Sequence, residues 1–142
     1  MGFPFFCSQK KNAATGSRAT GDFGEEASVR YLKKLHLRIL ARNVRCGGHE
    51  EIDIVAEDRT TRRYVEVKTR RQSPDLPSRF GTPAEAVTRE KQRHLISAAR
   101  AYQSSRPTKK AVYMDVIEVY LDPEQEEPAL LAVRYLRDAF RA

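Results

Sequence analysis

The sequence is poor in the residues that hold small secreted domains together and in the apolar runs that cross membranes. It has 142 residues, no tryptophan, and two cysteines, Cys7 and Cys46. Two cysteines form neither a disulfide framework nor a zinc-ligand spacing, which favours a reducing compartment. No apolar run approaches the roughly 20 residues of a membrane-spanning helix, and residues 3–6 are too short for the core of a signal peptide. We therefore expect a cytoplasmic protein without a membrane partner.

Acidic residues are outnumbered by basic ones. There are 26 Lys and Arg against 19 Asp and Glu, which gives a formal charge of +7. Such an excess fits a nucleic-acid partner or, less specifically, another polyanion or an anionic surface. The length allows one domain with a sizeable core. Residues 1–20 show no hydrophobic periodicity, so we expect a flexible basic arm there and a single domain over residues 21–142.

The order of the hydrophobic patterns predicts an α/β fold. Apolar residues recur at helical spacing from Asp22 to about His36, and the first turn of this helix would carry Asp22, Glu25 and Glu26, as the helix dipole favours. Strands are expected over residues 37–44, 50–57, 63–70, 111–121 and 130–136, a turn at 47–48, a short helix from residue 82 and a longer helix over 88–104. The run 111–121 is apolar on both faces, so we expect a mixed sheet flanked by helices.

Two charged triplets, at residues 51–53 and 66–68, interrupt strands that should otherwise be apolar. Alternate residues of a strand share a face, so Glu66 and Lys68 point the same way, as do Glu51 and Asp53. An even hairpin loop centred after residue 59 would set Asp53 opposite Glu66 and Glu51 opposite Lys68. An odd loop without a bulge would move Asp53 to the other face. With the even loop, three carboxylates and one amine converge.

Carboxylates that face one another on a sheet destabilise it unless a positive charge lies between them. Magnesium suits such a site because it takes oxygen ligands and keeps several waters. Lys68 could orient an attacking water beside the ion and offset charge that develops on a phosphate oxygen. The alternative is a solvent-facing polar surface with cross-strand ion pairs, Glu51 with Lys68 and Asp53 with a nearby arginine.

The order of these motifs resembles the core of the PD-(D/E)XK nucleases, the restriction-endonuclease-like superfamily, and more narrowly the YraN-like family of small bacterial proteins. The resemblance covers residues 22 to about 120. It rests on Gly24-Glu25, Leu40-Ala41-Arg42-Asn43, Glu51-Ile52-Asp53-Ile54-Val55-Ala56, Val65-Glu66-Val67-Lys68-Thr69-Arg70, Glu85-Ala86-Val87 with Lys91, and Asp115-Val116. It implies an α-β-β-β-α-β core with a mixed central sheet.

The resemblance also implies roles for individual residues. Asp53 and Glu66 would be ligands of Mg²⁺ or Mn²⁺, Lys68 would position the water, and Glu25 would approach from the first helix as a further acid. For Glu25 the alternative is a charge that only complements its helix N-terminus. The chain departs from the family pattern in having Glu50 where a glycine usually precedes the Glu-Ile-Asp triplet, and His36 where a glycine usually ends the first helix.

For the other charged residues, a functional and a structural role are both possible. Basic residues near the triplets and on the second long helix would contact phosphates without reading sequence, or would form a solubilising face. The set expected to bind nucleic acid is Arg62, Arg63, Arg70, Arg71, Lys91 and Arg93. Asp115 lies in an apolar strand, where an unpaired carboxylate would be costly. We expect it to pair with Arg38, Arg42 or Lys68 rather than to bind a metal.

Together these observations lead us to expect a magnesium-dependent endonuclease that acts on DNA, branched or damaged DNA included. The alternatives are a nucleic-acid-binding accessory protein of DNA repair or recombination that keeps the fold without cleaving, and an RNA- or ribosome-associated binder. A homodimer also stays open, because many resolving enzymes act as dimers on two-fold symmetric substrates.

Overall fold

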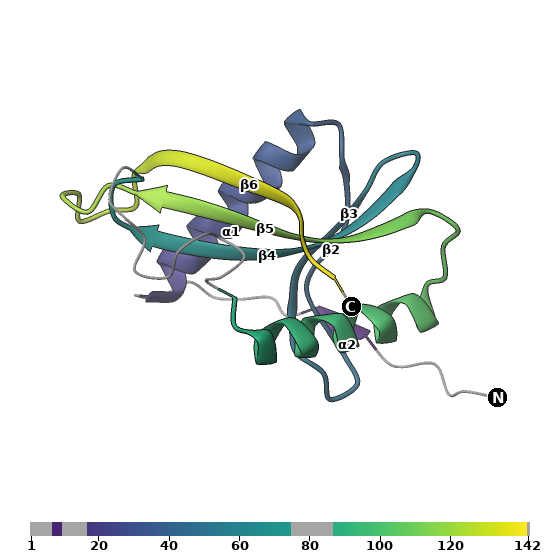
Figure 1. Cartoon of the computed structure of the whole chain (residues 1–142). Helices are drawn as coiled ribbons and strands as arrows, with labels where there is room; N and C mark the ends of the chain where they lie inside the picture. The colour runs from purple at the N-terminus through teal and green to yellow at the C-terminus, as the bar shows by residue number, and fades with distance from the viewer. Residues whose placement is uncertain (1–6, 10–16, 75–86, 142) are drawn as a thin grey trace.

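A computed structural model of the chain describes residues 7–9, 17–74 and 87–141. Within these residues, two helices and six strands follow one another (Figure 1). They are β1 (Cys7–Gln9), α1 (Ser17–Lys34), β2 (Arg38–Cys46), β3 (Ile52–Glu57), β4 (Thr61–Arg71), α2 (Arg89–Ser105), β5 (Ala111–Leu121) and β6 (Leu130–Phe140).

The described strands form one mixed sheet in the order β1-β2-β3-β4-β5-β6. Neighbouring strands are antiparallel except for β4 and β5, which pair in parallel over Thr61–Arg71 and Ala111–Leu121. A parallel pair needs a long crossover, and α2 lies in the connection between these two strands. The predicted α/β class with a mixed sheet is confirmed.

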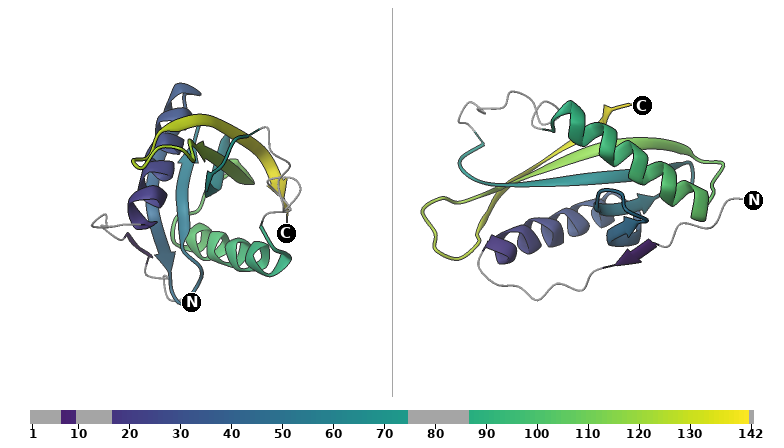
Figure 2. Two further views of the ribbon diagram at one scale, coloured as in Figure 1. Left: turned by 90° about the vertical axis from the view of Figure 1, so that its left-hand side faces the viewer. Right: turned by 90° about the horizontal axis from the view of Figure 1, so that it is seen from below.

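The two helices cover opposite faces of this sheet (Figure 2). Neighbouring strand residues point to different cores: Tyr64 packs in the cluster that contains α2, whereas Val65 packs in the cluster that contains α1. Val116 and Ile117 of β5 divide in the same way. Strand β5 is buried continuously from Met114 to Leu121, as its apolar residues of both parities predicted.

Helix α1 begins earlier than the hydrophobic spacing predicted. It starts at Ser17, so Asp22, Glu25 and Glu26 lie beyond the first turn, which carries no acidic residue. The expectation that these acids complement the helix N-terminus was therefore wrong. The extra turn is formed by residues 17–21, which contain no apolar periodicity to reveal it.

His36 follows the end of α1, at the position where the family pattern usually has a glycine. His36 has a φ of 64°. Its N–H donates to the Lys33 carbonyl at 2.9 Å, and the Leu37 N–H donates to the Leu32 carbonyl at 3.1 Å. These are the two hydrogen bonds of a Schellman motif, whose left-handed position usually holds glycine. His36 thus ends the helix in the glycine geometry.

Helix α2 matches its prediction closely. It begins after Thr88, whose hydroxyl accepts the Lys91 N–H at 3.1 Å. Leu95, Ala98 and Tyr102 are buried on its inner face. The short helix predicted from Thr82 falls in residues 75–86 and lies outside the described residues. The last strand, β6, reaches Phe140, four residues beyond the predicted end at residue 136.

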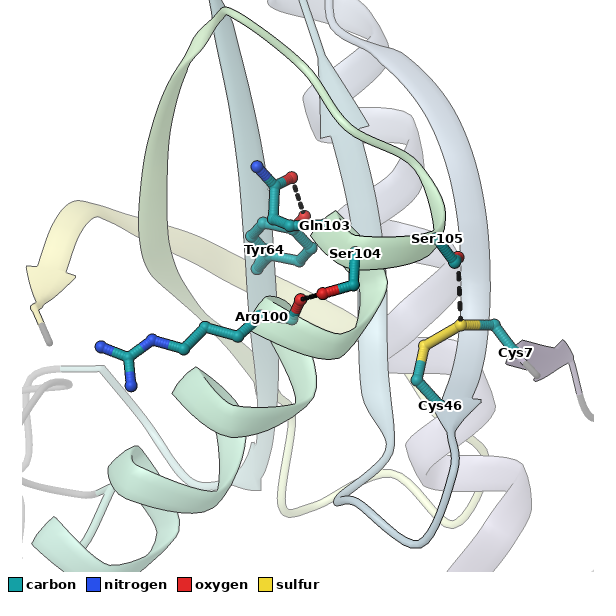
Figure 3. Close-up of a disulfide and its surroundings, with 7 residues drawn as sticks. All are labelled: Cys7, Cys46, Tyr64, Arg100, Gln103, Ser104 and Ser105. Carbon is teal, nitrogen blue, oxygen red and sulfur yellow. Dashed lines mark hydrogen bonds between the residues drawn. A yellow bond between two sulfur atoms is a disulfide. The ribbon is translucent and has the colours of Figure 1, made fainter. Parts of the chain in front are cut away.

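The two cysteines form a disulfide, contrary to the expectation from their number (Figure 3). Strand β1 lies within the segment for which we expected no regular structure, and it pairs with β2 so that Cys7 is directly opposite Cys46. The two cysteines are 39 residues apart in the sequence, and this spacing gives no sign of the strand pairing that brings their sulfur atoms together. The cysteines therefore no longer support a reducing compartment. No helix in the described part of the chain is long and apolar enough to cross a membrane.

Candidate functional site

The β3–β4 hairpin brings Asp53 beside Glu66. Ile54 pairs with Val65, and Glu57 pairs with Arg62, which is the register of the predicted even loop. Asp58 fixes that loop, since its Oδ1 accepts the N–H groups of Thr60 and Thr61 at 2.9 and 2.7 Å. When this register is continued by one residue beyond Ile54 and Val65, Asp53 lies opposite Glu66.

Asp53 and Glu66 are two adjacent carboxylates with little access to water. Asp53 is half-buried, and its Oδ2 accepts the Val67 N–H at 2.8 Å. Burial, together with the negative charge of Glu66, raises the pKa of Asp53 well above its ordinary value. Burial also raises the pKa of Glu66, although Lys91 and Lys68 oppose the shift. Glu66 Oε2 is buried and accepts no hydrogen bond within the described structure. The pair therefore lacks full compensation of its charge.

Two lysines lie at the edge of this pair. Lys68 Nζ is 3.5 Å from Glu66 Oε1, and Lys91 Nζ is 3.9 Å from the same oxygen. Their side chains are 34% and 31% exposed, so both amines lie where the site meets solvent. The predicted position of Glu51 opposite Lys68 lies beyond the pairing of β3 with β4, because β3 begins only at Ile52, and the ion pair found for Lys68 is with Glu66.

Glu50, the residue that departs from the family pattern, holds one of these lysines. Its Oε1 is 2.7 Å from Lys91 Nζ. The hydrogen bond from Lys91 is the main cause that lowers the pKa of Glu50. Lys91 consequently bridges Glu50 and Glu66, a link that the sequence did not reveal. The one sign of this link in the sequence was Glu50 itself, an acid where the family pattern usually has a glycine.

Glu25 is a buried acid on the α1 side of the site. Its Oε1 accepts Arg42 Nε and Asn43 Nδ2, both at 2.9 Å. Burial raises the pKa of Glu25 against the effect of Arg42, and the charge of Glu25 in turn contributes to the raised pKa of Asp53. Glu25 thus approaches Asp53 while its own charge is balanced by Arg42. Its role in chemistry stays a prediction.

Asp115 is a structural acid, as expected, but with a partner that we did not name. It is fully buried. Its carboxylate accepts Arg63 Nη1 at 3.1 Å, the Asp138 N–H at 2.8 Å and the Tyr135 hydroxyl. Arg38 and Arg42, two of the predicted partners, instead pair with Glu57 and Glu25.

The predicted phosphate contacts divide into buried and exposed groups. Arg62 is buried and donates to Gln103 Oε1 at 2.8 Å and to the Arg106 carbonyl. Arg63 is committed to Asp115. We therefore withdraw these two residues from the phosphate-contacting set, because strand alternation and acidic partners on other strands turn their guanidinium groups inward.

The remaining members of that set differ in their access to solvent. Arg70 is largely buried, with Nε 3.5 Å from Glu118 Oε1. Arg71 and Arg93 are exposed, and Lys91 is half-buried at the site. The parallel register sets Glu118 beside Lys68, so Glu118 is a further acid next to the site. Sequence reasoning missed it, although it is, with Asp115, one of the two charged residues of β5.

The donor set fits a hard cation with few protein ligands. Within the described residues, no group of three or more His, Cys, Asp and Glu side chains could hold a metal ion. Mg²⁺, however, commonly binds through one or two carboxylates and keeps waters or substrate oxygens in its other positions. Asp53 and Glu66 supply two such carboxylates, and the orphaned Glu66 Oε2 is an oxygen that a cation would satisfy.

Comparisons with known proteins identify a family of similar chains. The model of a family described as "Uncharacterised protein family UPF0102" matches residues 24–119. A UPF0102 protein of Caldicellulosiruptor saccharolyticus is 40% identical over 87% of this chain and 98% of its own length. UPF0102 proteins of Geotalea daltonii and Symbiobacterium thermophilum are 38% and 39% identical over 87% and 89% of this chain, and over 91% and 99% of their own lengths.

Proposed function

This chain belongs to the uncharacterised protein family UPF0102, and we propose that it is a magnesium-dependent endonuclease that hydrolyses phosphodiester bonds in DNA, branched or damaged DNA included. One observation carries the proposal. Asp53 and Glu66 lie side by side with raised pKa values, and Glu66 Oε2 is buried without a hydrogen bond. A site built only for stability would not retain two such groups with incomplete compensation of their charge.

Each residue of the site then has a distinct task. Asp53 and Glu66 would hold Mg²⁺ or Mn²⁺, and the ion, when bound, supplies a Lewis acid that stabilises charge on the phosphate. Lys68, at the solvent edge of the pair, would orient a water molecule by its ammonium group. Lys91 offers a second cation at that edge, where a phosphate oxygen of the substrate would arrive.

The order of elements around this pair is what supports membership of the PD-(D/E)XK superfamily. The Asp strand and the Glu-x-Lys strand are adjacent and antiparallel, a helix with an acid covers one face, and α2 connects the Glu-x-Lys strand to a parallel neighbour. We propose the restriction-endonuclease-like core on this basis.

A nucleic-acid-binding protein that does not cleave is the second candidate. It is favoured by the salt bridge between Glu50 and Lys91, which occupies one cation of the site, and by the small number of carboxylates. Such a protein would act as an accessory in DNA repair or recombination, or on RNA. It has no need for the exposed amine of Lys68 beside two carboxylates that repel phosphate.

Cleavage assays separate the two candidates. The full chain is incubated with branched, nicked and single-stranded DNA and with RNA, in Mg²⁺, in Mn²⁺ or in chelator. The nuclease proposal expects metal-dependent cleavage that is lost in Asp53→Ala and Lys68→Ala, while both variants still bind. Equal cleavage by wild type and both variants would indicate a contaminant, and binding without cleavage in every condition would favour the accessory protein.

A further inference from the structure

A groove separate from the carboxylate pair runs between α2 and the end of β6. Two adjoining hollows of about 500 and 620 Å³ share Ile96, Arg100, Phe140 and Arg141 among their lining residues. The end of β6 lies close to α2 in Figures 1 and 2. These residues are outside the set that we assign to catalysis.

The rim of the groove is strongly basic. Arg89, Arg93 and Arg100 of α2 and Arg141 after β6 all line it, and all four are exposed. In the hollow that Arg89 and Arg93 line, none of the described residues is acidic. The acid of the adjoining hollow, Asp138, is paired with Arg141. Figure 3 shows Arg100 extending from α2 away from the Cys7–Cys46 disulfide.

Apolar side chains lie in the groove beside these cations. Ile96 and Phe140 line both hollows, and Val112, which is 41% exposed, lines one of them. A helix rises about 1.5 Å per residue, so Arg89 and Arg93 are about 6 Å apart along α2, and Arg93 and Arg100 about 10 Å. A single line of cations beside apolar side chains matches a single nucleic-acid strand, which presents phosphates on one edge and base faces on the other. A duplex keeps its base faces stacked inside.

Helix α2 connects the groove to the carboxylate pair. Lys91, which reaches Glu66, lies on the same helix, about half a turn around it from Arg89 and Arg93. A strand that leaves the site would pass around the first turn of α2 to reach the groove. We propose that this groove binds a single-stranded arm of the DNA substrate. The inference rests on the proposed function and adds to it the kind of substrate: duplex DNA with a single-stranded branch or tail.

Binding assays in chelator test the groove without requiring cleavage. The full chain and Arg93→Gln/Arg100→Gln are titrated against labelled oligo-dT, blunt duplex DNA and the same duplex with a single-stranded tail. The matched control is Arg30→Gln/Lys34→Gln, which removes two exposed charges four residues apart on α1, across the sheet. Circular dichroism checks that all variants fold.

We expect the groove variant to lose about tenfold in affinity for oligo-dT and tailed duplex, as the loss of two charge-assisted phosphate contacts implies. Its affinity for blunt duplex should match that of the control. The slope of log K against log salt for oligo-dT should fall by about 1.4, from about 0.7 for each phosphate contact. These results would stand even if no cleavage were ever observed, which separates this inference from the nuclease proposal.

Three outcomes would overturn the inference. The first is that the groove variant binds oligo-dT as tightly as the wild type does. The second is that it loses the same affinity for blunt duplex as for tailed duplex. The third is that an oligoglutamate of the same charge competes with oligo-dT for the groove as strongly as unlabelled oligo-dT does. The last outcome would assign the groove to an acidic peptide. An Ile96→Glu variant tests the apolar side chains independently, since a new carboxylate there should weaken oligo-dT binding at least as much as the loss of one arginine.

Discussion

Asp53 and Glu66 illustrate a residue-level conflict between stability and function. A carboxylate with a raised pKa binds its proton more tightly in the folded chain than in the unfolded one. Its contribution to stability is therefore complete below the unfolded pKa and is lost as the pH rises through the folded pKa. At neutral pH both residues oppose folding, and a bound cation would relieve that opposition.

Replacing Asp53 with asparagine should therefore stabilise the metal-free protein. The amide keeps an oxygen that can accept the Val67 N–H and removes the charge that opposes Glu66. In chelator at pH 7.5 we expect the Tm of Asp53→Asn to rise by about 3 °C, the shift that about 1 kcal/mol gives in a chain of this size. The difference should shrink at pH 4. Thermal unfolding measures this difference, and Glu126→Gln, which removes an exposed acid, is the control. A Tm of Asp53→Asn below that of the wild type at pH 7.5 would contradict the account.

Magnesium should stabilise the wild type more than it stabilises Asp53→Asn. A ligand that binds the folded chain stabilises it according to its concentration and affinity. Adding Mg²⁺ should raise the Tm of the wild type and leave that of Asp53→Asn nearly unchanged, when ionic strength is matched with a monovalent salt. Equal shifts in both proteins would place any bound ion elsewhere.

Asp115 should behave as a structural residue. Asp115→Asn leaves the largely buried Arg63 without its counter-charge, and breaking a buried pair costs about 3 kcal/mol or more. Chemical denaturation should show this loss, while the stabilisation by Mg²⁺ should persist in the variant. Loss of the Mg²⁺ effect with stability intact would instead make Asp115 a metal ligand.

At the scale of elements, the approach of α1 to the sheet is set by a glycine. A Cβ on Gly24 would collide with the Thr69 side chain of β4. Gly24→Ala should therefore cost about 2 kcal/mol, since overpacking outweighs the better helix propensity of alanine. The double variant Gly24→Ala/Thr69→Ala removes the colliding atoms and should recover most of the loss in urea denaturation. A fully additive effect of the two substitutions would rule out this contact as the cause.

The disulfide is the covalent link between β1 and the rest of the sheet. It closes a loop whose ends are 39 residues apart, and the chain-entropy relation gives about 4 kcal/mol for a loop of this length. Reduction, or Cys7→Ser, should lower the Tm by about 10 °C. Because Cys7→Ser has no disulfide to reduce, reductant should change the Tm of this variant no further. A wild-type Tm that is insensitive to reductant would contradict the disulfide.

Sequence reasoning succeeded where local rules decide the structure. The loop at Asp58 fixes the hairpin register, and with it the meeting of Asp53 and Glu66, within a few residues. It failed where partners come from distant elements. Arg63 looked like a phosphate contact until Asp115 of β5 appeared beside it, and Cys7 looked unpaired until β1 joined β2. The early start of α1 was missed because its first residues are polar.

For the whole molecule, the carboxylate pair and the arginine groove both receive side chains from α2, which contributes Lys91 to the first and three arginines to the second. If both proposals hold, this arrangement would relate cleavage to the recognition of a branched or tailed substrate. The chain as a whole is basic, with a formal charge of +7, so all binding should weaken as salt rises. Binding that is insensitive to salt would refute phosphate contact altogether.

The most direct test of the account is the rate of strand cleavage by wild type and Glu66→Gln, purified identically, on one tailed duplex with Mg²⁺ and with chelator. Glutamine keeps the shape of Glu66 and removes one of the two charges that would hold the ion. The account predicts cleavage by the wild type in Mg²⁺ only, and a rate at least about a hundredfold lower in the variant. Equal rates in the two proteins, or cleavage that persists in chelator, would contradict it.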